Sequence, residues 1–312
     1  MKTAAQKDSP SSDSKIGTSG QAQKPVAIVT GANSGIGKAS AIALASQGIH
    51  VAALCRSEQR GKQAVADIKA ASGGDVTLFV GDLSDFDSIN QFVTDYKKKF
   101  DRLDILIHNA GLLAKNRHEN KDGIEMNLAV HHLGPFLMNQ LLMPTILQTR
   151  GSRIVIVTSM AHAMGKLDFD DLQLNNSYKT MGAYSRSKLC NLLYMQELDR
   201  RLEGTGTTVN CVHPGAVATN ISAGDRDLGV SIKKLNIFQK IASKFIKTPE
   251  QGAATIVYVA TSKDTANISG KYWANMKIHK TRAITHDRAL ADQLWQVSED
   301  LIAPYLDQST SE

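Results

Sequence analysis

Cysteine, proline and aromatic residues are scarce in this chain of 312 residues, which has 3 Cys, 7 Pro and 5% Phe, Trp and Tyr. The cysteines, Cys55, Cys190 and Cys211, are odd in number and far apart in the sequence. This pattern excludes a disulfide framework and does not match the spacing of metal ligands. We therefore expect buried free thiols, no metal site, and a reducing compartment such as the cytoplasm.

Long apolar runs are also absent, because none approaches the roughly 18 to 20 residues that span a bilayer. The first 24 residues are polar, with a serine-rich centre, and lack the apolar stretch of a signal peptide. We expect residues 1–24 to form a disordered tail and residues 25–312 to form a single domain.

The net charge of +6 is not arranged as in nucleic-acid-binding proteins, since the sequence has no Arg-rich helix and no interleaved aromatic and basic residues. A phosphorylated small ligand accounts for the positive charge equally well. The composition therefore indicates a small-molecule partner and no nucleic acid.

Short apolar runs alternate with helical patterns along most of the chain. The predicted strands are 25–29, 50–56, 76–81, 103–109, 153–159 and 207–213, and the predicted helices are 36–45, 58–71, 85–100, 123–148 and 183–202. Several strands are apolar on consecutive residues, as expected when helices cover both faces of a sheet. The alternation predicts an α/β fold of the Rossmann type, with one doubly wound parallel sheet and helices on both faces.

One segment, Thr219 to Lys247, interrupts this alternation before a helix that Thr248 is expected to cap. Apolar side chains from Ile232 to Ile246 form a stripe opposite several lysines. The stripe fits a substrate lid over residues 219–248, a helix in peripheral contact with a membrane surface, or a helix docked on the core. We expect the last predicted helix, 286–302, to cap the edge of the sheet.

The stretch from Val29 to Lys38, VTGANSGIGK, places three glycines between a predicted strand and a predicted helix. Gly31 permits a tight turn, Gly35 lets a ligand approach the backbone, and Gly37 lets the helix pack closely on the strand. Backbone N–H groups and the helix dipole at such a turn suit a phosphate. The alternative is a turn that needs glycine only for its dihedral angles, but the carboxyl edge of a parallel sheet favours the phosphate site.

The end of the second predicted strand indicates which dinucleotide is bound. An acidic residue there would bind the adenosine ribose of NAD(H) and repel a 2′-phosphate. This strand instead ends with Cys55 and Arg56, and Lys38 adds positive charge nearby. A guanidinium binds phosphate through two parallel hydrogen bonds. Although Arg56 alone would also fit a solvated charge, the missing acid favours NADP(H).

Candidate catalytic residues follow in the second half of the chain. Tyr184 and Lys188 are four residues apart in a predicted helix and face the same way. An ammonium near a phenol lowers the phenol pKa and makes Tyr a usable general acid or base. Ser159 ends a strand of the same sheet, so its hydroxyl can polarise a carbonyl there. An exposed Tyr–Lys pair is the alternative.

These motifs together resemble the short-chain dehydrogenase/reductase family over residues 25 to about 302. The stretches SMAHAMGKLDFDDL, AYSRSKLCN, VHPGAVATN and LADQLWQVSEDL are similar to its retinol-dehydrogenase-like branch. The motifs that carry the resemblance are Thr30 to Gly37, Asn109-Ala110-Gly111, Ser159, Tyr184 to Lys188 and Pro214-Gly215.

The resemblance implies an oxidoreductase that interconverts an apolar aldehyde or ketone (retinal-, lipid-aldehyde- or steroid-like) and its alcohol, and the charges at the second strand end make NADP(H) its expected cofactor. We also expect a homodimer. It implies that Tyr184 is the general acid or base, that Ser159 holds the substrate oxygen, and that Lys188 binds the nicotinamide ribose. The cofactor-binding residues implied are Gly31, Asn33, Ser34, Gly35, Ile36, Gly37, Lys38, Arg56, Asp82, Leu83, Asn109, Ala110, Gly111, Tyr184, Lys188, Pro214, Gly215 and Thr219.

Two positions depart from the family pattern. His108 replaces the first of two asparagines, and His131 stands where the family has a catalytic Asn that maintains a helix irregularity and a relay water. A neutral imidazole donates and accepts hydrogen bonds as an amide does, so we expect His131 to hold that water. The alternative hypothesis is an NADP(H)-binding regulatory or scaffold protein without turnover.

Overall fold

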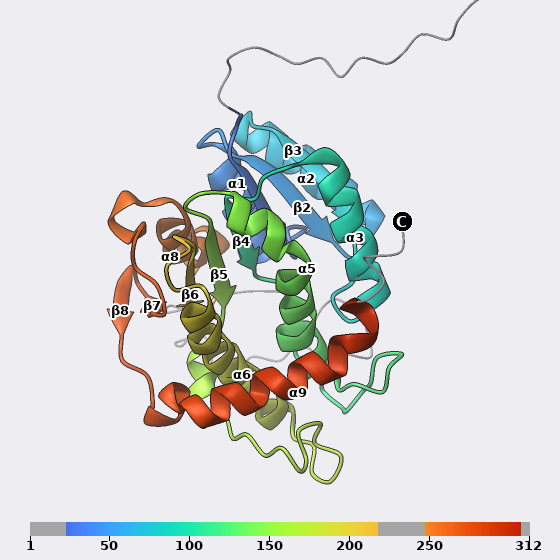
Figure 1. Cartoon of the computed structure of the whole chain (residues 1–312). Helices are drawn as coiled ribbons and strands as arrows, with labels where there is room; N and C mark the ends of the chain where they lie inside the picture. Colours follow the sequence, from blue (N-terminus) through green and yellow to red (C-terminus); the bar gives the residue numbers. More distant parts are fainter. Residues whose placement is uncertain (1–22, 218–246, 307–312) are drawn as a thin grey trace, which may run out of the picture.

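The six apolar runs predicted as strands form a parallel sheet, and two short strands extend it at one edge (Figure 1). The structure, a computed structural model, describes residues 23–217 and 247–306. Neighbouring strands are parallel throughout the order β3-β2-β1-β4-β5-β6-β7, and β8 is antiparallel to β7. The strands are β1 (Val26–Thr30), β2 (His50–Cys55), β3 (Val76–Val80), β4 (Ile105–His108), β5 (Arg153–Val157), β6 (Thr208–His213), β7 (Tyr272–Ala274) and β8 (Lys277–His279).

Helices cover both faces of this sheet (Figure 1). The α-helices are α1 (Gly35–Ala45), α2 (Glu58–Ser72), α3 (Phe86–Lys99), α4 (Met126–Leu128), α5 (Gly134–Gln148), α6 (Thr180–Arg201), α8 (Pro249–Thr261) and α9 (Arg288–Leu306). Shorter turns are the π-helical turn η1 (Ala129–Leu133) and the 3-10 turns η2 (Met160–Met164), η4 (Lys263–Thr265) and η5 (Ala283–His286).

The sheet separates two hydrophobic cores, as β1 illustrates. Ala27 and Val29 lie in the core shared with α1 and α8, whereas Ile28 lies in the core shared with α3, α5 and α6. Every residue of β1 is buried, because both of its faces are covered. The predicted fold class, an α/β fold with a doubly wound parallel sheet, is confirmed.

The position of β1 in the sheet locates the functional site. Its two neighbours are β2 and β4, so the chain builds the sheet outward from β1 in both directions. Ligands of doubly wound sheets bind at the carboxyl ends of the strands where this order reverses. The glycine-rich turn follows β1 at this point, between Thr30 and the start of α1 at Gly35.

The helix predicted over residues 123–148 has an irregular first half. It begins at Met126, because Asn120 folds the preceding residues into a turn in which Gly123 has φ +74°. The Glu125 carboxylate then caps α4 by accepting from the N–H groups of Asn127 and Leu128. The π-helical turn η1 interrupts the helix before α5.

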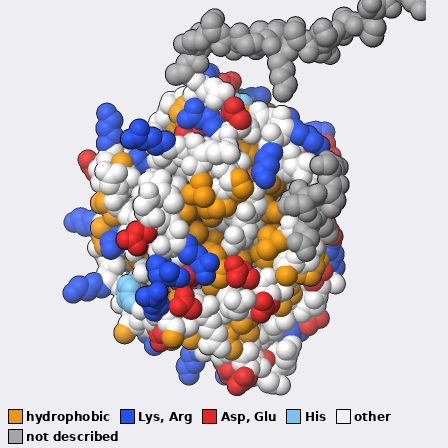
Figure 2. All heavy atoms as spheres, in the orientation of Figure 1, with side chains coloured by type: hydrophobic (Ala, Val, Ile, Leu, Met, Phe, Trp, Pro, Cys, Tyr) orange, Lys and Arg blue, Asp and Glu red, His pale blue; other side chains and the backbone are white. Residues whose placement is uncertain are grey.

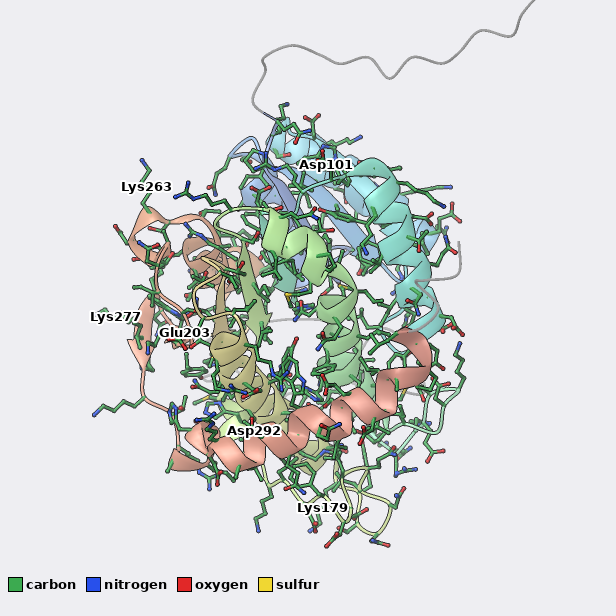
Figure 3. The ribbon with its side chains drawn as sticks, in the orientation of Figure 1. Asp101, Lys179, Glu203, Lys263, Lys277 and Asp292 are labelled. Atoms are coloured by element: carbon green, nitrogen blue, oxygen red, sulfur yellow. The ribbon has the colours of Figure 1, made fainter. Side chains whose placement is uncertain are left out.

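Two features of the C-terminal part differ from the sequence prediction. The last helix does not cap the sheet edge: α9 crosses α6 and α5 on one face, where Trp295 packs against Phe136 at a ring-centroid distance of 4.8 Å (Figure 1). The edge is formed by β8, which was not predicted because its residues are exposed and not apolar as a set. Lys277 of β8 lies at the periphery of the molecule (Figure 3).

Several predictions concern segments outside the described residues. Apart from its last two residues, the predicted tail 1–24 is one of these, and so is almost all of the predicted lid 219–248. Thr248 does cap α8 as predicted, in a capping box with Gln251. Within 23–217 and 247–306, no helix combines the length and apolar character needed to cross a membrane. Figure 2 shows apolar side chains at the surface over α5. The homodimer stays a prediction.

Candidate active site

The glycine-rich turn forms one wall of a cavity of about 540 Å³ at the carboxyl ends of the strands. Gly31 and Gly35 have positive φ angles of +68° and +54°. A Cβ atom on Gly37 would lie 2.3 Å from the Gly31 carbonyl oxygen, so glycine is needed for the predicted close packing. Ser34 stands at the N-cap of α1 without a side-chain cap bond, and the first turn has no acidic residue. This helix end can therefore receive an anion.

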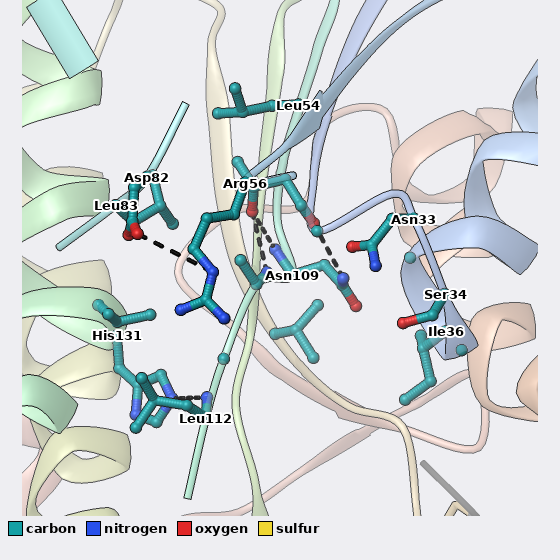
Figure 4. A pocket seen from close by; sticks show the side chains of 18 of the residues that line it. Asn33, Ser34, Ile36, Leu54, Arg56, Asp82, Leu83, Asn109, Leu112 and His131 are labelled. Atoms are coloured by element: carbon teal, nitrogen blue, oxygen red, sulfur yellow. Dashed lines mark hydrogen bonds and ion pairs between the residues drawn. The ribbon is translucent and has the colours of Figure 1, made fainter. Parts of the chain in front are cut away.

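Most of the predicted cofactor residues line this cavity together. They are Gly31, Asn33, Ser34, Gly35, Ile36, Gly37, Arg56, Asp82, Leu83, Asn109, Ala110, Gly111, Tyr184, Lys188 and Pro214. Figure 4 shows Asn33 and Ser34 on one side of the cavity and His131 beside Leu112 on the other. Residues from both halves of the sequence thus share one site.

Arg56 extends its guanidinium into the cavity, with Nε 3.9 Å from Asp82 Oδ2 (Figure 4). Arg60 lines the same region and was missed by the sequence argument, although it lies one helical turn beyond Arg56. Ser57 caps α2 by accepting from the Arg60 N–H, which fixes this turn. Two guanidinium groups therefore border the end of the cavity next to β2.

Lys38 differs from its predicted placement. It is not among the cavity-lining residues, and its Nζ lies 2.5 Å from Asp67 Oδ2. Its ammonium pairs with the carboxylate of Asp67 on α2, and Asp67 itself lines the cavity. The positive charge expected beside Arg56 is supplied by Arg60 instead.

Thr30 fixes the loop after β4 to the end of β1, a role that sequence reasoning missed. Its hydroxyl oxygen accepts hydrogen bonds from the N–H groups of Asn109 and Ala110, both at 2.9 Å. The Asn109 amide donates in turn to the Thr30 carbonyl oxygen at 2.9 Å. These bonds hold the backbone of the Asn109-Ala110-Gly111 loop against the glycine-rich turn.

The structure brings Ser159, Tyr184 and Lys188 together at the other end of the cavity. The Ser159 side chain lies near the Tyr184 hydroxyl, and Ser159 stands two residues after the end of β5. The Lys188 ammonium lies 5.5 Å from the centroid of the Tyr184 ring and donates to the Val157 carbonyl oxygen at 3.2 Å. Tyr184 and Lys188 line the cavity directly.

The electrostatics of this group differ in one respect from the expectation that Lys188 lowers the Tyr184 pKa. Burial raises the pKa of Tyr184, and the hydrogen bond with Ser159 opposes this effect. Burial also lowers the pKa of Lys188 to about 8, because an ammonium is costly to desolvate. The lysine is directed at Val157, so the serine makes the close contact with the phenol.

His131 lies in the π-helical turn η1, at the helix irregularity expected there. Its ring stands edge-on to the Tyr184 ring at a centroid distance of 5.6 Å. Burial and the positive charge of Lys188 hold the pKa of His131 well below its usual range, so the imidazole is neutral at pH 7 as predicted. The expected relay water at this side chain is not supported, because both ring nitrogens are hydrogen-bonded to protein groups, Nε2 to the Leu112 N–H and Nδ1 to the Ser187 hydroxyl.

Another predicted residue, Gly215, is not among the residues that line the cavity, whereas its neighbour Pro214 is. Gly215 has φ +93° and lies beside the Lys247 side chain. Thr219 lies outside the described residues. Cys55, Cys190 and Cys211 are buried free thiols, as expected.

A comparison with protein families explains this arrangement. The sequence profile of the short chain dehydrogenases matches residues 25–227. The chain belongs to the short-chain dehydrogenase family. Its mouse relative "Retinol dehydrogenase 14" is 36% identical over 286 residues, which cover 88% of this chain and 85% of the relative. The bovine "Dehydrogenase/reductase SDR family member 13" is 37% identical over 278 residues, covering 88% and 72%.

Solved structures have the same fold. An uncharacterised protein from Mycobacterium Paratuberculosis superposes with a TM-score of 0.70 at 29% identity, covering 90% of this chain and 93% of that one. A 3-ketoacyl-ACP reductase from Sinorhizobium meliloti has a TM-score of 0.61 at 28% identity, covering 80% and 96%. Oxidoreductase chemistry with a nicotinamide cofactor is the activity of this family.

The cavity fits such a cofactor on its own geometry. The open N-terminus of α1 and the glycine-rich turn provide N–H groups for a pyrophosphate. The loop after β4 and Lys188 border the end nearest Tyr184. A nicotinamide cofactor would therefore extend from Arg56 and Arg60 toward Tyr184.

Proposed function

We propose that this chain is an NADP(H)-dependent oxidoreductase that interconverts an apolar aldehyde or ketone and the corresponding alcohol. The observation that supports it best is the shared cavity: Tyr184 and Lys188 border one end, and Arg56 borders the other. A cofactor held along the glycine-rich turn would reach from the guanidinium to the phenol.

In the proposed reaction, Tyr184 exchanges a proton with the substrate oxygen. A bound nicotinamide supplies the hydride to the carbonyl carbon in reduction and accepts it in oxidation. The Tyr184 hydroxyl gives its proton to the carbonyl oxygen, while the nearby Ser159 hydroxyl donates a hydrogen bond to the same oxygen. Lys188 remains mostly protonated at pH 7, since its pKa is about 8, and its charge favours the phenolate that forms.

The preference for NADP(H) follows from the charges beside β2. Cys55 is buried at the strand end where an acidic residue would select NAD(H), and Arg56 and Arg60 border the cavity next to it. Guanidinium groups bind a 2′-phosphate through charge-assisted hydrogen bonds. Asp82, at 3.9 Å from Arg56, orients the guanidinium without cancelling the charge of the pair of arginines.

Apolar substrates are favoured by exposed methionines on the two elements that follow Ser159 and carry Tyr184. Met160 and Met164 are 67% and 64% exposed on the turn that follows Ser159, and Met181 is 49% exposed in the first turn of α6. Flexible methionine side chains suit varied apolar ligands. The names of the retinol dehydrogenase relatives agree with a substrate of this class.

The test is consumption of NADPH by the purified chain with retinal, medium-chain aldehydes, steroids and quinones. We expect turnover with long apolar carbonyl compounds, and its loss in Tyr184→Phe with cofactor binding retained. A chain that binds NADPH but turns over none of the panel would instead be a regulatory or scaffold protein.

A further inference from the structure

His131 joins two walls of the cavity through a buried chain of hydrogen bonds. Its side chain is 2% exposed. The Leu112 N–H donates to His131 Nε2 at 2.9 Å (Figure 4), and His131 Nδ1 lies 2.8 Å from Ser187 Oγ. The Ser187 hydroxyl donates onward to the Tyr184 carbonyl oxygen at 2.8 Å. These hydrogen bonds thus connect the loop after β4 with the helical turn that carries Tyr184.

These partners determine which nitrogen of His131 carries the proton. A backbone N–H can only donate, so Nε2 must be the unprotonated acceptor. The Ser187 hydroxyl gives its own proton to the Tyr184 carbonyl oxygen, so its oxygen accepts from Nδ1–H. The imidazole is therefore the neutral Nδ1–H tautomer. Neither nitrogen retains a lone pair or proton for a water molecule.

The surrounding backbone is fitted to this ring. A Cβ atom added to Gly111 would lie 2.9 Å from His131 Nε2, so glycine is required where the loop passes over the imidazole. On the other side, the Asn191 amide donates to the His131 carbonyl oxygen at 2.7 Å when its nitrogen is oriented by the hydrogen-bond network. Asn191 thereby satisfies a backbone carbonyl of the π-helical turn. Both the ring and the backbone of His131 are held within the protein.

We propose that His131 is a positioning residue that fastens the loop Asn109–Leu112 to the catalytic helix α6 and does not itself transfer the proton. This inference rests on the proposed function, because it assigns the loop to the cofactor side of the site. The loop lines the cavity at Asn109, Gly111 and Leu112, and α6 lines it at Tyr184 and Lys188. Fixing the loop to α6 sets the distance between a bound cofactor and the Tyr184 phenol.

Two conservative variants separate the two bonds of His131. In His131→Gln, the longer side chain places an oxygen near the position of Nε2 and keeps an acceptor for Leu112. In His131→Asn, the shorter side chain places its amide near Nδ1 and keeps the donor to Ser187. Loss of the acceptor leaves the half-buried Leu112 N–H unpaired, which is costly. Ser187→Ala, which removes only the partner of Nδ1, is the matched control for the other bond.

The first measurements use the chain without cofactor. Nitrogen NMR of His131 should show Nδ1 protonated and Nε2 unprotonated from about pH 6 to about pH 8, a range that includes the usual His pKa of about 6.5. Hydrogen exchange at the Leu112 amide should accelerate about tenfold or more in His131→Asn and change little in His131→Gln and Ser187→Ala. A protonated Nε2, or equal exchange at Leu112 in the Asn and Gln variants, would overturn the proposal.

The remaining measurements compare binding with catalysis. Because the loop lies on the cofactor side, His131→Asn should weaken NADPH binding severalfold, and the pH values at which kcat changes should stay those of the wild type. A shifted pH profile with unchanged NADPH binding would show a relay role and refute positioning. If the wild type binds no NADPH, the proposed function fails, while the tautomer and the Leu112 exchange still decide the role of His131.

Discussion

The buried ion pair between Glu125 and Arg186 gives a sharp prediction about stability. Arg186 Nη2 lies 2.7 Å from Glu125 Oε2, and the side chains are 2% and 0% exposed. Arg186 stands between Tyr184 and Lys188 in α6, and Glu125 caps α4 directly before the π-helical turn. The pair therefore anchors the catalytic helix, and Arg186→Met should destabilise the whole fold.

The magnitude follows from what the substitution leaves behind. Removing the guanidinium leaves a buried carboxylate whose charge is balanced only by hydrogen bonds from Asn127 and the N–H of Leu128. Breaking a buried pair in this way costs about 3–5 kcal/mol. For a chain of this size, that loss corresponds to a decrease in Tm of roughly 6–10 °C.

The assay is unfolding of the cofactor-free chain by urea and by calorimetry. The double variant Glu125→Gln with Arg186→Met should recover at least about 1 kcal/mol, because it removes the uncompensated charge and keeps an acceptor for the cap. Lys62→Met is the matched control, since its ion pair with Glu58 is exposed on α2 and its loss should leave Tm unchanged. A cost below about 1 kcal/mol for Arg186→Met, or no recovery in the double variant, would refute the reasoning.

The other predictions concern cofactor choice, catalysis and pH. Arg56→Ala should weaken NADPH binding by about 1.5–3 kcal/mol and NADH binding much less, measured by titration; equal wild-type affinities for the two cofactors would refute the preference. Tyr184→Phe should retain NADPH binding and lower kcat about a hundred- to ten-thousand-fold, and a variant with more than about a tenth of the wild-type rate would show another proton donor. Burial lowers the pKa of His108 to about 4 and that of His132 to about 3, so both bind protons only on unfolding as the pH falls below about 6.5. Each should then cost about 1.4 kcal/mol of stability per pH unit until its own pKa is reached, and an acid unfolding profile that is unchanged in His108→Asn would contradict this for His108.

The parallel sheet was predictable because its signal is local. Residues of β1 and β5 are apolar on consecutive positions, and only strands covered on both faces have that pattern. The glycine-rich turn was predictable for a related reason, since Gly31 and Gly37 each meet a steric demand that no other residue satisfies. In both cases the short-range sequence determines the structure.

Contacts between distant segments were not predictable in the same way. The hydrogen bond between Leu112 and His131 depends on how the π-helical turn meets the loop after β4, which no spacing reveals. Lys38 was expected to line the cavity, but its ammonium pairs with the carboxylate of Asp67 on the next helix, and Asp67 lines the cavity in its place. Arg60 offered a usable signal, because it follows Arg56 by one turn of a helix that Ser57 caps.

The central claim is that the cavity transfers hydride between NADP(H) and an apolar carbonyl compound. The most direct test incubates the chain with a long-chain aldehyde or retinal and with NADPH that carries deuterium at both hydrogen positions of the nicotinamide C4, and analyses the alcohol by mass spectrometry. The account predicts one deuterium on the carbinol carbon of the alcohol formed by the wild type, and at least about a hundredfold less of this alcohol from Tyr184→Phe in the same time. Alcohol that lacks deuterium, or no alcohol from any apolar carbonyl compound despite NADPH binding, would contradict it.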